Sequence, residues 1–248
     1  MTSVSLPIDF THRTAPEDLP ELMDEPCSYE DFRACLSDLA QVNRLTLAHR
    51  PTLQFLERLI EAKPLSRPLR IVDVGCGGGD MLRHIAVWAK RRGVAVTLTG
   101  IDLNPYAAQA AREFSGKDRS SQWDIEWVTG DAFSYAPPDG VDVVLSSLFT
   151  HHLPEPEIVR FLAWMESTAR LGWFVNDLCR ERTPHRLFQL LAGVMRWHYF
   201  VQYDGPVSIR RSFREEDWQR MIAASGIDLD VAQIARSFPA RLCVGRLK

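Results

Sequence analysis

The sequence predicts an α/β protein with a mostly parallel sheet that carries helices on both faces. Two observations lead to this expectation. Short apolar runs rich in β-branched residues alternate with amphipathic, helix-length segments from about residue 68 to residue 178. The first run, residues 71–74, ends in a glycine-rich turn that leads directly into a predicted helix. Alternation of strands and helices favours right-handed crossovers between parallel strands, which place helices on both sides of the sheet.

The glycine-rich turn after the first strand is typical of a nucleotide-binding loop. Gly75, Gly77 and Gly79 form a G-x-G-x-G pattern, and Asp73 precedes it by two residues. Glycine permits positive φ and a close approach of a ligand to the backbone, and the start of a helix offers free N–H groups. The dinucleotide-binding pattern requires a further glycine where this chain has Asp80, which argues against a nicotinamide oxidoreductase.

Acidic residues follow the next two predicted strands. Residues 97–101 are followed by Asp102, and residues 127–130 by Asp131. A carboxylate at such a position can accept hydrogen bonds from both hydroxyl groups of a ribose. Because ligands bind at the carboxyl ends of parallel strands, these acids and the fourth strand, residues 141–148, should border one crevice.

The glycine loop and these acids, in this order and spacing, resemble the class I S-adenosyl-L-methionine (SAM)-dependent methyltransferases. The resemblance is specific over about residues 68–178 and looser beyond them. It implies a Rossmann-like class I methyltransferase fold with a mostly parallel, seven-stranded sheet. The last two strands of this fold form an antiparallel hairpin, which is expected at residues 227–234 and 240–247.

The resemblance also implies a division of the chain. Residues 1–67 are expected to form an N-terminal extension with two helices that cover SAM and the substrate as a lid. Plain packing of these helices on the sheet is the alternative. Residues 68–248 are expected to form the SAM-binding core, with a substrate-covering helical insertion at about residues 179–212, after the fifth strand.

The same resemblance assigns residues to the cofactor, whose product is S-adenosyl-L-homocysteine (SAH). The loop is expected to contact the amino-acid part of SAM, Asp102 to bind the ribose, and Asp131 to accept a hydrogen bond from the adenine amine. The expected cofactor contacts are Asp73, Gly75, Cys76, Gly77, Asp80, Asp102, Leu103, Asn104, Asp131, Ala132, Phe133, Ser147 and Leu148.

His151 and His152 follow the fourth predicted strand and are the candidate catalytic residues. An imidazole with a pKa of about 6.5 can take a proton at neutral pH, and a phenol with a pKa of about 10 would benefit from that base. Alternatively, both histidines only pack around SAM. In that case the resemblance implies that His152 shapes the cofactor pocket and that His151 is the freer side chain. No third ligand with a clear spacing accompanies them, so no metal is expected.

Further segments are expected to form the acceptor site. An apolar helix at about residues 185–199 could wall an acceptor pocket or form a dimer contact, and a turn is expected at residues 204–206 before a last helix at residues 213–224. The aromatic and aliphatic residues of the insertion at about residues 179–212 favour a hydrophobic acceptor. The expected substrate contacts are Asn43, Asn176, Asp177, Met195, Tyr199 and Arg210.

These features predict a SAM-dependent methyltransferase that methylates a phenolic or quinone-like hydroxyl of a hydrophobic small molecule. The wider pattern resembles bacterial methyltransferases of secondary metabolism, which act on quinone, phenol or polyketide compounds. C-methylation of a similar ring and a SAM-binding protein without turnover remain as alternatives. The fourth strand is not followed by an Asn-Pro-Pro-Tyr run, which disfavours methylation of DNA bases.

The composition of the 248-residue chain sets further limits. A net charge of −3 shows no basic field that would attract nucleic acid. No apolar run reaches the roughly 18 residues of a membrane span, and the N-terminus lacks the apolar region of a signal peptide. Five scattered cysteines fit a reducing cytoplasm. A cytoplasmic enzyme with a small-molecule partner is expected, and a homodimer is left open.

Overall fold

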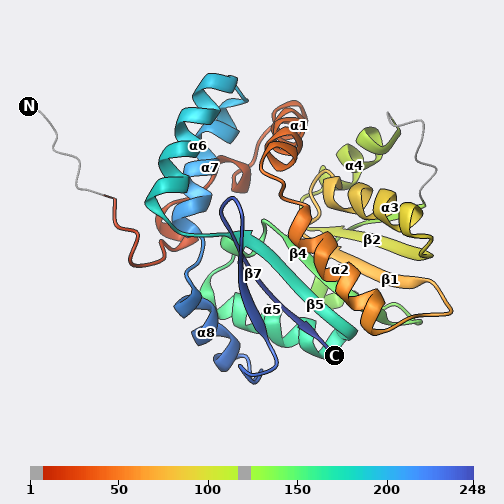
Figure 1. The fold of residues 1–248 in the computed structure, drawn as a ribbon. Coiled ribbons are helices and arrows are strands. Elements are labelled where there is room, and N and C mark those ends of the chain that lie inside the picture. The colour runs from red at the N-terminus through yellow and green to blue at the C-terminus, as the bar shows by residue number, and fades with distance from the viewer. Residues whose placement is uncertain (1–7, 117–123) are drawn as a thin grey trace, which may run out of the picture.

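Residues 8–116 and 124–248, which the computed structural model describes, form a seven-stranded sheet with helices on both faces (Figure 1). The strand order is β3-β2-β1-β4-β5-β7-β6. The first five strands are parallel, and β7 is antiparallel to β5 and β6. The predicted Rossmann-like sheet is therefore confirmed. Its strands are β1 Leu69–Val74, β2 Val96–Asp102, β3 Ile125–Thr129, β4 Val141–Ser147, β5 Ala169–Leu178, β6 Gln233–Ser237 and β7 Arg241–Leu247.

Two apolar cores cover the two faces of the sheet. In β1, Val72 and Val74 face the core shared with α5 and α8, whereas Leu69 and Ile71 face the core shared with α2 and α3. Apolar residues stand on both sides of this strand because both of its faces are buried. The helices are α1 Tyr29–Leu45, α2 Arg50–Ala62, α3 Asp80–Arg92, α4 Ala107–Gly116, α5 Glu155–Thr168, α6 Arg182–Met195, α7 Tyr199–Arg211 and α8 Glu215–Ala224.

Short 3₁₀ turns connect several of these elements. Ser28 caps α1, because its hydroxyl accepts a hydrogen bond from the backbone N–H of Asp31. None of the helices in the described ranges combines the length and the apolar character that a membrane crossing requires. The 3₁₀ turns are η1 Pro16–Asp18, η2 Leu22–Asp24, η3 Ala132–Ser134 and η4 Thr150–His152.

The insertion after β5 differs from its predicted local structure. The prediction of one helix at residues 185–199 is wrong. Helix α6 ends at Met195, and the next residue, Arg196, adopts a left-handed conformation with φ 52°. The prediction of a turn at residues 204–206 is also wrong, because these residues lie within α7, which contains Pro206. The last helix starts at residue 215, and the first strand of the hairpin starts at residue 233, later than expected.

Tertiary contacts explain the turn-like residues within α7. The carboxylate of Asp204 accepts hydrogen bonds from the backbone N–H groups of Leu22 and Met23, at 2.7 and 3.1 Å. Gly205 lies against the ring of Phe188 on α6, and a Cβ at this position would overlap that ring. Asp and Gly therefore serve the contact of α7 with η2 and α6, rather than a turn.

Alanine substitutions of two helical glycines test this packing. Gly205→Ala should destabilise the protein by about 1–3 kcal/mol, because the added methyl group overlaps Phe188. Gly193→Ala in α6 is the matched control, since no atom lies within 4 Å of its Cβ position, and it should stabilise by up to about 1 kcal/mol. Urea unfolding of both variants measures the difference, and equal effects would contradict the close α6–α7 packing.

Candidate active site

A cavity of about 790 Å³ opens at the carboxyl ends of β1, β2, β4 and β5. This is the edge at which the parallel topology predicts ligand binding. The loop after β1 and the ends of β2 and β4 form one part of the wall. Segments from η2, α1, α6 and α7 and the turn between β6 and β7 form the remainder. The N-terminal extension and the insertion after β5 therefore border the same cavity as the sheet.

The glycine loop after β1 has the backbone conformation that its sequence predicts. Gly75, Gly77 and Gly79 all have positive φ, at 72°, 48° and 72°. The carboxylate of Asp102 accepts hydrogen bonds from the backbone N–H groups of Gly77 and Asn104, at 2.8 and 2.9 Å. Asp102 thus holds the glycine loop and the end of β2 together at the cavity wall.

Three buried oxygen atoms of the cavity wall have no hydrogen-bond partner among the described residues. They are Oδ1 of Asp73, Oγ of Ser147 and Oδ1 of Asn43. Burial, together with the nearby carboxylates of Asp102 and Asp80, raises the pKa of Asp73 to about 8. Because unpaired buried polar atoms are costly, these positions suit a ligand that carries its own donors.

Asp80, the first residue of α3, links the glycine loop to the helices before the sheet. Its Oδ2 lies 2.5 Å from Nε2 of His49 and accepts a hydrogen bond from Nδ2 of Asn43 at 3.3 Å. The rings of His49 and His84 stack with their centroids 3.6 Å apart. Burial raises the pKa of Asp80, but the hydrogen bonds from His49 and His84 outweigh burial and hold it well below its usual range.

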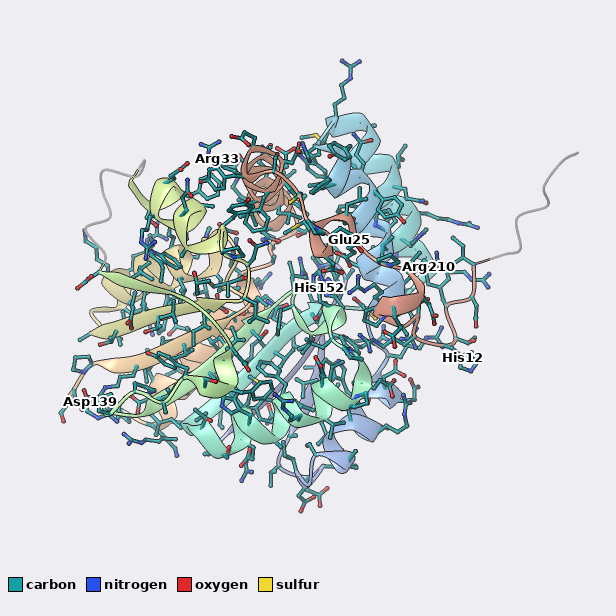
Figure 2. The ribbon with its side chains drawn as sticks, turned by 180° about the vertical axis from the view of Figure 1, so that it is seen from behind. His12, Glu25, Arg33, Asp139, His152 and Arg210 are labelled. Atoms are coloured by element: carbon teal, nitrogen blue, oxygen red, sulfur yellow. The ribbon has the colours of Figure 1, made fainter. Side chains whose placement is uncertain are left out.

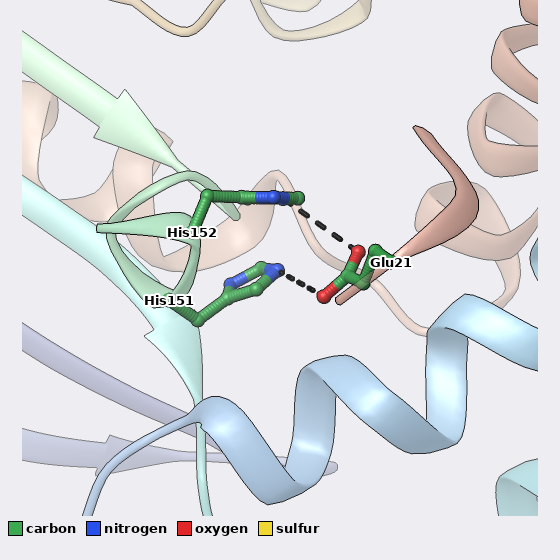
Figure 3. Close-up of side chains that lie close together, drawn as sticks. All are labelled: Glu21, His151 and His152. Atoms are coloured by element: carbon green, nitrogen blue, oxygen red, sulfur yellow. Dashed lines mark ion pairs between the residues drawn. The ribbon is translucent and has the colours of Figure 1, made fainter. Parts of the chain in front are cut away.

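A second polar cluster forms where η4 meets η2 (Figure 3). Nε2 of His151 lies 3.7 Å from Oε1 of Glu21, and Nε2 of His152 lies 3.8 Å from Oε2 of the same residue. The Nδ1 atoms bind other carboxylates: that of His151 lies 2.7 Å from Oδ1 of Asp177, and that of His152 lies 2.8 Å from Oδ1 of Asp24. Both imidazoles therefore direct Nε2 toward one carboxylate.

Burial and neighbouring charges set the protonation of this cluster. Burial raises the pKa of Asp177, but the interactions with His151 and Thr150 outweigh burial and lower the pKa to about 2. Burial lowers the pKa of His152, yet the carboxylates of Glu21 and Asp24 raise it above its usual value. His151 is only 3% exposed, so the expectation that it is the freer of the two histidines is wrong.

Two groups of side chains have donor atoms close enough to share a metal ion. One is Glu21 with His151 and His152, and the other is Asp80 with its two histidine neighbours, His49 and His84. In each group the ligand atoms lie within 4.8 Å of one another. The third donor of each group is distant in sequence, which is why spacing alone revealed neither. The expectation that no metal is bound stays a prediction.

Comparisons with known proteins decide the family. A family model described as a methyltransferase domain matches residues 71–172. A ubiquinone biosynthesis O-methyltransferase from Thiobacillus denitrificans is 33% identical over 203 residues, which cover 72% of this chain and 82% of that protein. The chain belongs to the class I SAM-dependent methyltransferases. It is an enzyme that uses SAM as its methyl donor and acts on a small molecule.

More distant matches agree with this fold. A trans-aconitate 2-methyltransferase from Mycobacterium tuberculosis is 29% identical over 120 residues, which are 48% of this chain and 41% of that protein. A plantazolicin methyltransferase in complex with a triazolic substrate analogue and SAH is 16% identical, with a TM-score of 0.62 and coverage of 88% and 96%. The magnesium protoporphyrin IX methyltransferase from Synechocystis PCC 6803 with bound SAH has a TM-score of 0.53 at 14% identity, with coverage of 82% and 84%.

Most residues predicted for the site of this methyltransferase border the cavity. Asp131, which caps η3 by accepting a hydrogen bond from Phe133 N, does not border it, and its role toward adenine stays a prediction. Ala132 and Phe133 also lie outside the wall. The predicted residues that line the cavity are Asn43, Asp73, Gly75, Cys76, Gly77, Asp80, Asp102, Leu103, Asn104, Ser147, Leu148, His151, His152 and Asn176.

The acceptor residues predicted from the insertion lie elsewhere. Met195 and Tyr199 are 43% and 55% exposed and do not line the cavity. Met195 is the last residue of α6, one turn beyond the lining residue Leu191, and Tyr199 is the first residue of α7. Arg210 lies toward the N-terminal segment, away from His152 (Figure 2), and its carbonyl accepts a hydrogen bond from Thr14 N. Asp177 does not line the cavity but binds His151, which does.

Helix α6 instead has two different faces. Leu187, Phe188 and Leu191 line the cavity, although Leu187 is still 61% exposed, whereas Leu190 and Val194 are exposed and lie outside the wall. Sequence reasoning identified this helix as apolar but assigned the wrong residues to the wall. A homodimer through the exposed side chains stays a prediction.

Replacing Asp73 tests the cost of its burial. With a folded-state pKa of about 8, the carboxyl group keeps its proton while the unfolded chain ionises near pH 4. The contribution of Asp73 to stability is therefore lost as the pH rises from about 4 to about 8. Without SAM, Asp73→Asn should gain stability relative to the wild type over this window, as measured by urea unfolding. Asp139→Asn, at an exposed site, is the control, and a pH-independent difference for Asp73→Asn would contradict the assignment.

Proposed function

We propose that this methyltransferase transfers the methyl group of SAM to a phenolic or quinone-like hydroxyl of a hydrophobic small molecule. The observation that carries the proposal is the buried pair of His151 and Asp177 at the cavity wall. Nδ1 of His151 binds the carboxylate, so Nε2 is left to face Glu21, which also lines the cavity. The printed name of the 33% identical relative, an O-methyltransferase of ubiquinone biosynthesis, supports a hydroxyl acceptor.

The cofactor occupies the part of the cavity next to the glycine loop in this proposal. Asp102, at the end of β2, binds the ribose hydroxyls while it keeps its contacts with Gly77 and Asn104. The unpaired atoms of Asp73 and Ser147 receive the polar amino-acid end. SAM supplies a methyl group on a sulfonium that is already activated for transfer.

The acceptor occupies the part of the cavity between η4, α6 and α7. Leu187, Phe188 and Leu191 of α6, with Val201 and Ile209 of α7, provide an apolar wall. The cluster around Glu21 adds a polar group to this part of the wall. A ligand with an apolar ring and one hydroxyl group matches this distribution, because the ring buries apolar surface and the hydroxyl meets the imidazoles.

His151 acts as the general base in this arrangement. The hydroxyl oxygen forms a bond to the methyl carbon as the bond between that carbon and sulfur breaks. The proton of the hydroxyl passes to Nε2 of His151, while Asp177 keeps Nδ1 protonated and stabilises the imidazolium. Alignment of donor and acceptor contributes a further part of the barrier reduction, of the order of 7–11 kcal/mol in well-oriented systems.

The ribose assignment is tested by Asp102→Ala. The loss of hydrogen bonds to a charged group should weaken SAM binding by roughly 1.5–3 kcal/mol in calorimetry. Asp102→Asn separates two effects, since the amide keeps the shape and one acceptor oxygen but loses the charge. Wild-type SAM affinity in the alanine variant would refute the assignment.

The base assignment is tested by His151→Ala. Turnover should fall by about 10²–10⁴-fold with a neutral phenol. The wild-type rate should decrease at acidic pH, because a protonated imidazole cannot accept the proton of the hydroxyl. An acceptor that is already ionised, or a higher pH, should restore most of the lost rate, because no proton then has to be removed.

His152→Ala is the comparison variant, because its imidazole lies beside His151 but binds Asp24. It should slow turnover less than His151→Ala. An equal loss for neutral and ionised acceptors in His151→Ala would show that this histidine is not the base.

A further inference from the structure

A buried arginine at the start of β7 differs from the other buried arginines of the described chain. Arg180 and Arg211 each have a carboxylate oxygen at 2.8 Å, from Asp217 and Asp24. Arg241 is 3% exposed and lines the cavity, yet within residues 8–116 and 124–248 no carboxylate oxygen lies within 4 Å of it.

The hydrogen bonds of Arg241 leave part of its guanidinium unused. Nη2 donates to Oγ1 of Thr46 at 3.2 Å, and Nη1 has no partner in the described part of the chain. Glu181, an acidic residue of the cavity wall, is bound by Arg236 and by Sγ of Cys179. The carboxylate of Asp177 accepts from His151 and Thr150 instead.

An unpaired charge at this position is unfavourable without a ligand. Burial lowers the pKa of Arg241 to about 10, although the charge of Asp177, beyond ion-pair distance, raises it, so the guanidinium remains protonated at neutral pH. A buried charge is tolerated when an opposite charge and hydrogen bonds compensate for the lost water. The planar guanidinium is well suited to a carboxylate, with which it forms charge-assisted hydrogen bonds.

We propose that Arg241 binds the carboxylate of a ligand in the cavity. Arg241 pairs with Leu178 across β5 and β7, beside the end of β5 that carries Asn176. Phe238 and Pro239, from the turn before β7, also line this part of the wall and give it an apolar border. The carboxylate belongs either to the amino-acid part of SAM or to the acceptor. The inference does not depend on which acceptor atom is methylated.

The first arm of the test concerns the cofactor. Calorimetry compares SAM with decarboxylated SAM, which lacks only the carboxylate, on the wild type and on Arg241→Met. If Arg241 binds the SAM carboxylate, the wild type prefers SAM by about 10–100-fold and the variant loses that preference. Arg246→Met is the matched control, because Arg246 lies on the same strand but pairs with Glu166 outside the cavity.

The second arm concerns the acceptor. A panel of phenolic acids, each paired with its amide, is titrated onto the SAH-bound protein. If Arg241 binds the acceptor carboxylate, SAM affinity is unchanged in Arg241→Met, and the acids lose about 10–100-fold in affinity while the amides do not. Arg241→Lys, which keeps the charge, should retain part of the preference.

Stability measurements separate ligand binding from a structural role. Without ligand, Arg241→Met should be at least as stable as the wild type in urea, since it removes an unpaired buried charge. The proposal is overturned if the variant keeps the wild-type preference for SAM over its decarboxylated form and no acid is bound more tightly by the wild type than its amide. A destabilised Arg241→Met with unchanged ligand preferences would likewise assign Arg241 to the fold alone.

Discussion

The carboxylate of Asp177 is the contact on which the polar end of the cavity, around His151, depends. It accepts hydrogen bonds from Thr150 Oγ1 and His151 N, at 2.5 and 3.2 Å, from His151 Nδ1 and from Leu178 N, at 2.7 and 2.8 Å. These donors join the end of β5 to η4. Because the carboxylate is fully buried, the cost of ionising it is offset only by this complete set of donors. The orientation of the His151 imidazole thus follows from the need of the buried Asp177 carboxylate for hydrogen-bond donors.

The N-terminal extension completes the same region. Arg13 donates hydrogen bonds to the carbonyls of His151 and Leu153, at 3.1 and 2.8 Å, and so holds the backbone around η4. Glu21 accepts a hydrogen bond from Ser208 on α7 at 2.9 Å. Residues that precede the sheet by about fifty positions therefore form part of the polar end of the cavity, and removal of this segment would leave the histidines without their shared carboxylate.

Local sequence patterns were sufficient for the cofactor side of the fold. The glycine loop, the strand ends and Asp102 depend on contacts between adjacent elements, and periodicity and positive-φ glycines reveal those contacts. The polar clusters were not predictable in this way. Glu21 and His151 meet through the packing of η2 on α7, and His49 reaches Asp80 through the placement of α2. Asp204 and Gly205 suggested a turn because their tertiary roles require the same residue types as a turn.

The cavity combines unsatisfied groups of opposite character. Asp73 is a buried acid whose pKa is raised, and Arg241 is a buried cation without a carboxylate partner. Each costs stability in the empty protein, and each serves a binding contact in the proposed complex. A ligand that offers donors to the first and an anion to the second recovers this free energy on binding. Part of the binding free energy would then come from pairing these two buried groups. A ligand that binds only the folded protein also stabilises it against unfolding.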